Sequence, residues 1–193
     1  MVTSEEILWI SQKLNINKLN KEITMETQTK KTIQKLKSLG YSPKVMEHDP
    51  VITMGDVVRT LDISTDSMAK TLLLSQKDIG LIAAIIPGMN RVDFSKVAAI
   101  LGVSEKTVKF AGPEITKKLG LNSGDMCPFH EFFQKIIMDA TLLKQRTVYC
   151  GSGDPRKTIV IDPKEMVKAI GATIADISQT TSVNNQTEGG SDE

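Results

Sequence analysis

The six-residue run Leu-Ile-Ala-Ala-Ile-Ile at positions 81–86 is the feature that most limits what this chain can fold into. Polar and apolar side chains do not alternate within it, as they would in a strand with one face in water. A short, continuously apolar strand is covered on both faces, because successive side chains point to opposite sides of a sheet. The turn sequence Pro87-Gly88 follows directly. The run therefore predicts a central strand inside a covered sheet.

Short strands and short helices alternate along the rest of the chain. Candidate strands lie at 45–47, 69–74, 108–110, 135–139, 147–150 and 158–161, and the last of these is the final clear strand. Candidate helices lie at 4–14, 26–39, 54–61, 93–101, 113–119 and from 163 to about 171. The alternation places the fold in the α/β (α+β) class. We expect a compact mixed β-sheet, or barrel-like core, surrounded by short helices.

The length of 193 residues suits one domain with extensions. We expect an N-terminal helical extension at 1–27, the domain itself at 28–178, and a disordered polar tail or linker at 179–193, where Ser, Thr, Asn, Gln and Gly predominate. Residues 1–44 contain eight Lys and four Glu, while 179–193 contain three acidic residues and no basic one. A basic arm is compatible with nucleic-acid contact and equally with a solvated helix face.

Other features narrow the classes of protein. The first six residues are acidic and polar, unlike a signal peptide, and no apolar run approaches the roughly 20 residues of a membrane span, so we expect a cytoplasmic protein without membrane contact. A zinc site could be drawn from the two cysteines and two histidines, but their spacing does not suggest one, and idle thiols are the simpler interpretation. We expect neither a metal nor a cofactor. The turn at 151–153, Gly-Ser-Gly, lacks the third glycine of a dinucleotide fingerprint and favours a hairpin.

Two segments could carry chemistry. Lys70 stands at the head of an apolar strand, in Met-Ala-Lys-Thr-Leu-Leu-Leu. Its ammonium group either reaches the edge of the sheet or points into a pocket, where desolvation favours the neutral form unless an anion lies nearby. The segment 124–128, Gly-Asp-Met-Cys-Pro, is either an ordinary surface loop or a loop whose glycine lets the backbone approach a ligand.

These segments occur in an order and spacing that resemble the YbaK family. The resemblance covers roughly residues 40–178 and rests on the segments at 47–50 (Glu-His-Asp-Pro), 69–73, 83–88, 124–128 (a GxxxP loop), 136–139, 148–153 and 159–161. That family includes the editing domain inserted in bacterial prolyl-tRNA synthetases and several free-standing relatives.

The resemblance implies an aminoacyl-tRNA deacylase that hydrolyses the ester of a mischarged tRNA. The expected substrate is tRNA-Pro carrying a small amino acid such as alanine or cysteine, recognised at its aminoacylated 3′ end. The protein would act in trans, or in cis as a module of a prolyl-tRNA synthetase. The implied catalytic residues are Lys70 and Gly124. The implied substrate-binding residues are Asp125, Met126, Cys127, Pro128, His48, Asp139, Gly151 and Gly153, with Met126 and Cys127 as pocket walls.

Several alternatives stay open at this point. Cys127 could be a nucleophile, with His130 close in sequence. His48 could serve only as a structural hydrogen-bonding group, and Asp139 could cap a turn. The segment 130–134 departs from the basic segment of the cysteine-specific members, which leaves the amino acid open. The whole domain could also be a non-catalytic module that binds tRNA or a synthetase.

Overall fold

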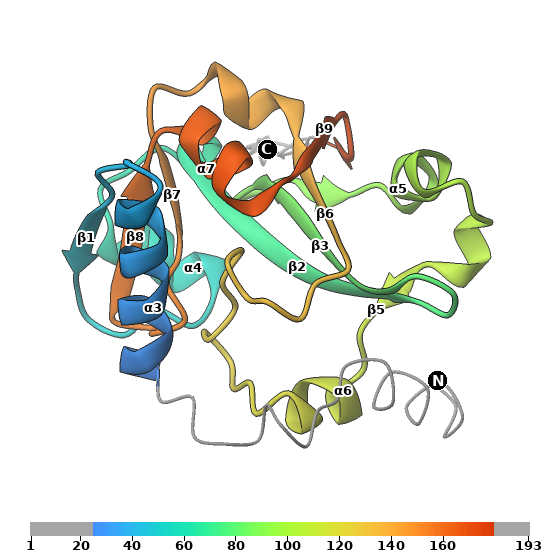
Figure 1. Ribbon diagram of the computed structural model, residues 1–193, viewed down its shortest axis with the longest axis horizontal. Coiled ribbons are helices and arrows are strands. Elements are labelled where there is room, and N and C mark those ends of the chain that lie inside the picture. The colour runs from blue at the N-terminus through green and yellow to red at the C-terminus, as the bar shows by residue number, and fades with distance from the viewer. Residues whose placement is uncertain (1–24, 180–193) are drawn as a thin grey trace, which may run out of the picture.

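The structure is a computed structural model, and it describes residues 25–179 (Figure 1). The helices are α3 (Met25–Ser38), α4 (Met54–Thr60), α5 (Phe94–Leu101), α6 (Pro113–Lys118) and α7 (Pro163–Ile170), with short 3-10 turns η1 (Thr65–Ser67), η2 (Glu105–Thr107) and η3 (Ala140–Lys144). The strands are β1 (Lys44–Glu47), β2 (Met68–Gln76), β3 (Gly80–Pro87), β4 (Arg91–Val92), β5 (Lys109–Phe110), β6 (Lys135–Asp139), β7 (Val148–Gly151), β8 (Lys157–Ile161), β9 (Thr173–Ala175) and β10 (Ser178–Gln179). The helix expected at 4–14 and nearly all of both expected extensions lie outside the described residues.

The strands confirm the expected mixed sheet. Seven of them follow one path, β1-β8-β7-β2-β3-β6-β9, and β5 pairs with β2 beside that path. The pairs β2–β7, β3–β6 and β6–β9 are parallel, and the others in this sheet are antiparallel. A separate two-stranded sheet joins β4 to β10. The long hairpin of β2 and β3 therefore lies at the centre of the main sheet.

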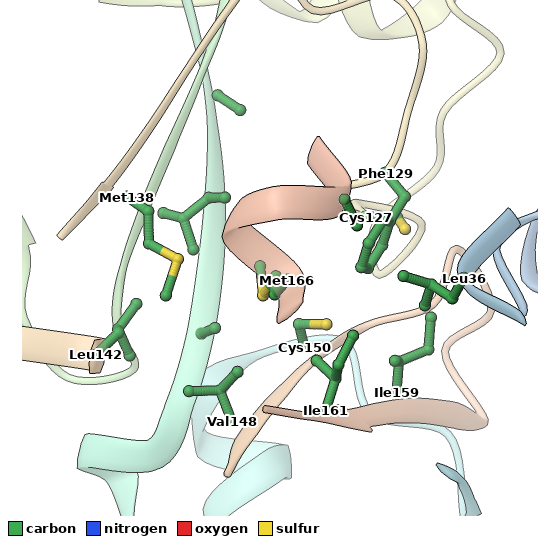
Figure 2. Packing of buried hydrophobic residues seen from close by; sticks show 14 residues of the cluster. Leu36, Cys127, Phe129, Met138, Leu142, Val148, Cys150, Ile159, Ile161 and Met166 are labelled. Carbon is green, nitrogen blue, oxygen red and sulfur yellow. The ribbon is translucent and has the colours of Figure 1, made fainter. Parts of the chain in front are cut away.

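Side chains cover β3 on both of its faces, as the apolar run predicts. Every residue of this strand is buried. The side chains at 83 and 85 join a core cluster with Leu36 of α3 and Met166 of α7, part of which Figure 2 shows. The side chains at 82, 84 and 86 join a second cluster with Val97 of α5. Alternate residues of β3 therefore contact two separate clusters, one that includes α3 and one that includes α5, and these two helices lie on opposite sides of the molecule (Figure 1).

Local sequence signals set the ends of the helices. The carboxylate of Asp93 accepts hydrogen bonds from the first main-chain N–H groups of α5, and Gly102 ends that helix in the left-handed conformation. Pro163 occupies the first turn of α7, where its missing N–H leaves no bond unmade, and Gly171 ends the helix in the same way as Gly102. These local contacts set where each helix begins and ends.

The expectation that the segment at 158–161 is the last strand is wrong. Two further strands follow, because β9 adds in parallel to β6 and β10 pairs with β4. The expected tail therefore starts inside an ordered strand, since Gln179 belongs to β10. Within residues 25–179, no helix combines the length and the apolar character that crossing a membrane would require.

Candidate active site

A cavity of about 220 Å³ lies beside the first residues of β2. Its walls come from β2, α4 and the residues flanking that helix, the loop after α6, β7 and the β7–β8 turn. The lining residues are Val51, Ile52, Thr53, Met54, Val57, Leu61, Ile63, Met68, Ala69, Lys70, Thr71, Gly124, Met126, Tyr149, Cys150, Gly151, Asp154, Pro155, Lys157 and Thr158. Segments from three distant parts of the sequence thus meet here, and the two predicted catalytic residues, Lys70 and Gly124, are both among them.

Lys70 is half-buried at this wall rather than extended into bulk water. Ala69 before it belongs to the core cluster of α3 and α7, so the pleat of β2 turns Lys70 to the opposite face. Its Nζ donates a 2.8 Å hydrogen bond to the main-chain oxygen of Asn90. Burial lowers the pKa of Lys70 below its ordinary value of 10.5. The side chain therefore presents a partly desolvated ammonium group whose acceptor here is a neutral carbonyl.

Gly124 brings the loop close to the other walls. Its φ of +91° is unfavourable for residues with a side chain, and a Cβ there would lie 3.1 Å from Cβ of Pro155 and 3.3 Å from the carbonyl oxygen of Val51. Gly151 is required on the opposite side, because a Cβ at that position would collide with the carbonyl oxygen of Met126. Gly124 thus lets the loop approach Val51 and Pro155, and Gly151 lets the backbone at Met126 pack against β7.

The structure brings four of the ten predicted site residues to this cavity: Lys70, Gly124, Met126 and Gly151. Asp125 and Gly153 line a different cavity of about 560 Å³, beside α3 and residues 119–121. We take the smaller cavity as the candidate site because Lys70 lines it. A Cβ at Gly153 would lie 2.6 Å from Cγ of Gln28, so this glycine makes room for α3.

The remaining loop residues support the backbone. The Oδ2 atom of Asp125 accepts hydrogen bonds from the main chain of Asn122 at 2.8 Å and from its side chain at 3.1 Å. Pro128 is buried and does not line the cavity. These contacts close the loop on itself, and they present Met126, rather than its neighbours Asp125 and Cys127, to the cavity.

The geometry does not support Cys127 as a nucleophile or as a pocket wall. Its side chain is fully buried in the core that Figure 2 shows, and burial raises the pKa of its thiol to about 12. The imidazole of His130 is also buried, which lowers its pKa, and its Nε2 donates to the carbonyl oxygen of Asp125 at 3.1 Å. Neither half of a thiolate–imidazole pair is available to a substrate in the cavity.

His48 and Asp139 lie behind the site rather than in it. The Nε2 of His48 hydrogen-bonds Oγ1 of Thr158 at 2.9 Å, and Thr158 lines the cavity. Asp139 is fully buried at the end of β6, where its carboxylate caps η3. Among residues 25–179, no three His, Cys, Asp or Glu side chains are placed to share a metal ion.

Sequence reasoning missed most of the other lining residues. The apolar wall is made by α4 and its flanks, through Met54, Val57 and Leu61, together with Met68 of β2. The polar wall includes Asp154, Lys157 and Thr158 from the β7–β8 turn and β8. A helix at 54–61 was predictable, but which side it shows to the cavity depends on contacts with residues far away in the sequence.

Comparison with known proteins decides the family. The model of the aminoacyl-tRNA editing domain family matches residues 48–169, more than half of the chain. The chain belongs to this family. The matched range contains Lys70, the 124–128 loop and every other residue that lines the cavity. The resemblance to the YbaK family is thereby confirmed.

Solved structures agree with the fold of this editing domain. The crystal structure of a hypothetical protein superposes with a TM-score of 0.69 at 25% identity, over 79% of this chain and 99% of that one. The crystal structure of a candidate trans-editing enzyme for prolyl tRNA synthetase gives a TM-score of 0.68 at 24% identity, over 79% of this chain and 97% of that one. No curated protein matches the chain.

Proposed function

We propose that this editing domain is an aminoacyl-tRNA deacylase, and that it hydrolyses the ester bond of a mischarged tRNA in the cavity beside β2. One observation carries the proposal: Lys70 and Gly124, from distant segments, line the same cavity of about 220 Å³. Membership of the editing-domain family supports the same reaction. The substrate enters with its aminoacylated 3′ end, and the rest of the tRNA stays outside.

The proposed reaction needs no covalent bond between the protein and the substrate. The oxygen of a water molecule bonds to the ester carbonyl carbon, and the carbonyl electron pair moves to oxygen. The intermediate then breaks its bond to the ribose oxygen, which takes up a proton, and releases the free amino acid. The neighbouring ribose hydroxyl of the substrate can relay the proton that the attacking water loses to the departing ribose oxygen, and the carbonyl double bond re-forms as that oxygen leaves. The protein's part is to position the ester and to stabilise the oxyanion, and the ammonium of Lys70 is suited to either task.

The ester and the α-ammonium group of the aminoacyl moiety need partners of opposite charge, and the cavity lining contains both lysines and a carboxylate. Lys70 and Lys157 can attract phosphate or developing negative charge, whereas Asp154 can attract the α-ammonium group of the amino acid. The remaining lining is mainly apolar. In this arrangement the ester of a bound substrate faces Lys70 and its α-ammonium group faces Asp154.

The size of the cavity favours a small amino acid. Its volume of about 220 Å³ lies below the roughly 300–1,000 Å³ of sites that enclose drug-sized ligands. A pocket that excludes the larger cognate amino acid corrects an error that a synthetic site makes, because one methylene changes binding by only about 1–3 kcal/mol. Met126 and Met54 are the walls we expect to set this limit.

We propose tRNA-Pro carrying alanine or cysteine as the substrate. The support is the similar fold of the candidate trans-editing enzyme for prolyl tRNA synthetase, together with the small cavity. Either mode of action, in trans or as a module of the synthetase in cis, suits a domain whose substrate is the 3′ end of a tRNA.

Deacylation of a panel of mischarged tRNAs by the wild-type protein and by Lys70→Ala tests the proposal. The wild type should release a small amino acid from tRNA-Pro, and Lys70→Ala should lose at least about 100-fold in rate, as expected when a group that stabilises an oxyanion is removed. Lys168→Ala is the matched control, because Lys168 is exposed on α7 and does not line the cavity. If the wild type binds tRNA and hydrolyses none of the panel, the domain is a binding module and the proposal fails.

A further inference from the structure

A chain of hydrogen bonds connects Lys70 to a carboxylate in the C-terminal part of the fold. The Nζ of Lys70 donates to the main-chain oxygen of Asn90 at 2.8 Å. The side-chain Nδ2 of Asn90 donates to Oγ of Ser178 at 2.9 Å. The hydroxyl of Ser178 lies near the carboxylate of Asp139 and helps to lower its pKa. Residues that are distant in sequence thus form one connected polar path behind the cavity.

Asp139 fixes the direction of this path. The Oγ of Ser178 accepts from Nδ2 of Asn90 at 2.9 Å, so its own hydroxyl proton is left for the nearby carboxylate of Asp139, which can only accept. The lone pairs of Ser178 then face Asn90, which must donate through Nδ2. Asp139 is itself held by the main-chain N–H groups of Thr141 at 2.9 Å and of Ile177 at 3.1 Å. Burial by itself would raise the pKa of Asp139, but the hydrogen bonds from Thr141, Ser178 and Ile177 together outweigh it, so the pKa is lowered and the carboxylate stays charged.

Asn90 is also fixed through its backbone. Its N–H donates to the carbonyl oxygen of Pro87 at 3.0 Å, and Arg91 after it pairs with Gln179 in the β4–β10 sheet. Lys96 of α5 bonds Asp176 at 2.8 Å and the carbonyl oxygen of Ser178 at 3.1 Å. The carbonyl of Asn90 is therefore held from both sides, and its direction sets where the ammonium of Lys70 can rest.

We propose that Asn90 and Ser178 are positioning residues that aim the Lys70 ammonium into the cavity, with Asp139 as their fixed anchor. A lysine has high rotamer freedom, and a free ammonium would leave the half-buried wall for water. One neutral acceptor restrains the side chain and leaves its other two N–H groups for the substrate. This inference rests on the proposed function for its catalytic consequence, but the restraint itself can be measured without any substrate.

Two variants break the path at different points. Ser178→Ala removes the bridging hydroxyl, and Asn90→Ala removes the amide while it keeps the main-chain carbonyl. Ser75→Ala is the matched control, because Ser75 is a buried serine of the same strand as Lys70 whose hydroxyl has no hydrogen-bond partner among the described residues. Should Ser178→Ala fail to fold, as its amide spectrum would reveal, Asn90→Ala decides the question alone, since Asn90 is only half-buried.

The first measurement is the proton spectrum of the lysine ε-methylene groups in protein labelled with carbon-13 lysine. A restrained Lys70 gives two separate Hε signals in the wild type and in Ser75→Ala, and one averaged signal in Ser178→Ala and Asn90→Ala. The second measurement is single-turnover deacylation. Here the two variants should fall by up to about 100-fold in rate, the size of effect that a small misplacement produces, with unchanged half-saturation by tRNA.

Each result has one meaning for the inference. Separate Hε signals in both variants, or averaged signals with an undiminished rate, would overturn it. If the wild type deacylates no tRNA at all, the proposed function fails, while the Hε signals still decide whether Asn90 and Ser178 hold Lys70. A merged pair in both variants with a slower rate supports the inference in full.

Discussion

At the residue scale, the two lysines of the cavity differ in what surrounds their charge. The Nζ of Lys157 lies 3.9 Å from Oδ2 of Asp154 and 4.0 Å from Oε1 of Glu47, so carboxylates partly balance it. Lys70 instead donates to a neutral carbonyl, and burial lowers its pKa. An anion that enters the cavity therefore interacts most strongly with Lys70, because no carboxylate of residues 25–179 forms an ion pair with this partly desolvated charge.

This difference predicts distinct kinetic effects for the two lysines. Lys70→Ala should lower kcat, since its charge acts on the oxyanion that develops during the reaction. Lys157→Ala should raise KM by less than about tenfold with little change in kcat, as expected for a contact that is equal in the ground state and the transition state. Steady-state deacylation over a range of tRNA concentrations separates the two. Equal losses of kcat in both variants would contradict the assignment.

The two thiols should be chemically silent in the native protein. Both are buried, and burial raises the pKa of Cys127 to about 12 and that of Cys150 well above its ordinary value. We expect no reaction with a thiol reagent at pH 8 in native conditions and two reactive thiols per chain in denaturant. Cys127→Ala should keep the deacylation rate within about twofold, because its thiol takes no part in the reaction. Rapid labelling of the native protein, or a folded but inactive Cys127→Ala variant, would instead support Cys127 as a nucleophile.

At the element scale, α4 supplies much of the apolar wall of the cavity, although its own side chains do not form part of the buried core. None of its residues is fully buried, and its start is held by a capping box, in which Thr53 and Asp56 bond each other's backbone N–H groups. Hydrogen bonds from Thr53 are the first cause of the lowered pKa of Asp56. Local capping, more than packing, therefore keeps Met54 and Val57 facing the cavity.

Removal of this cap should loosen α4 alone. Thr53→Ala should weaken the helix by about 1 kcal/mol, which corresponds to roughly fivefold faster amide exchange across 54–60. Thr60→Ala at the other end of α4 is the control, since it removes no cap. Native-state hydrogen exchange measures both variants. Faster exchange in the central β2–β3 hairpin of Thr53→Ala would show that α4 is coupled to the core after all.

The elements also show what could be foreseen from the sequence. The central strand was predictable because six apolar residues leave no other place for it, and the helices at 93–101 and 163–171 because their caps are local. Strands β4, β9 and β10 have only two or three residues each, and distant partners define them. Within the site, Gly151 and Gly153 look alike in sequence, yet one faces the cavity and the other faces α3. Such directions depend on tertiary contacts that no local pattern encodes.

At the scale of the whole molecule, the C-terminal residues 176–179 close the fold behind the candidate site. Their N–H and side-chain groups bond Asp139 at the end of β6, Asn90 beside β4, and the capping Asp93 of α5, whose Oδ2 accepts from Gln179 at 2.7 Å. This short segment thus adds hydrogen bonds to three elements that also share a hydrophobic cluster. The stability of this closure should depend on the charge of the carboxylates that accept these bonds.

The dependence of stability on carboxylate charge can be measured at Asp139. Its pKa is lowered in the folded state from an ordinary value of 3.8, so folding favours the charged form. The stabilisation is complete above about pH 5 and is lost as the pH falls below 3.8 toward the folded pKa, because the unfolded chain binds the proton first. Asp139→Asn should lose about 2 kcal/mol at pH 7, the size expected for a hydrogen-bonded buried charge, and the difference from wild type should shrink in acid.

Urea unfolding of wild type and Asp139→Asn between pH 3 and pH 7 tests this expectation. Asp93, whose pKa the hydrogen bonds from Ser95 and Gln179 lower to about 2, contributes acid sensitivity to both proteins alike, so it cancels in the difference. A gap in unfolding free energy that stays constant with pH would mean that Asp139 contributes by shape alone. A gap that closes in acid would mean that the charge of Asp139, through the N–H of Ile177 that it accepts from, stabilises the C-terminal segment.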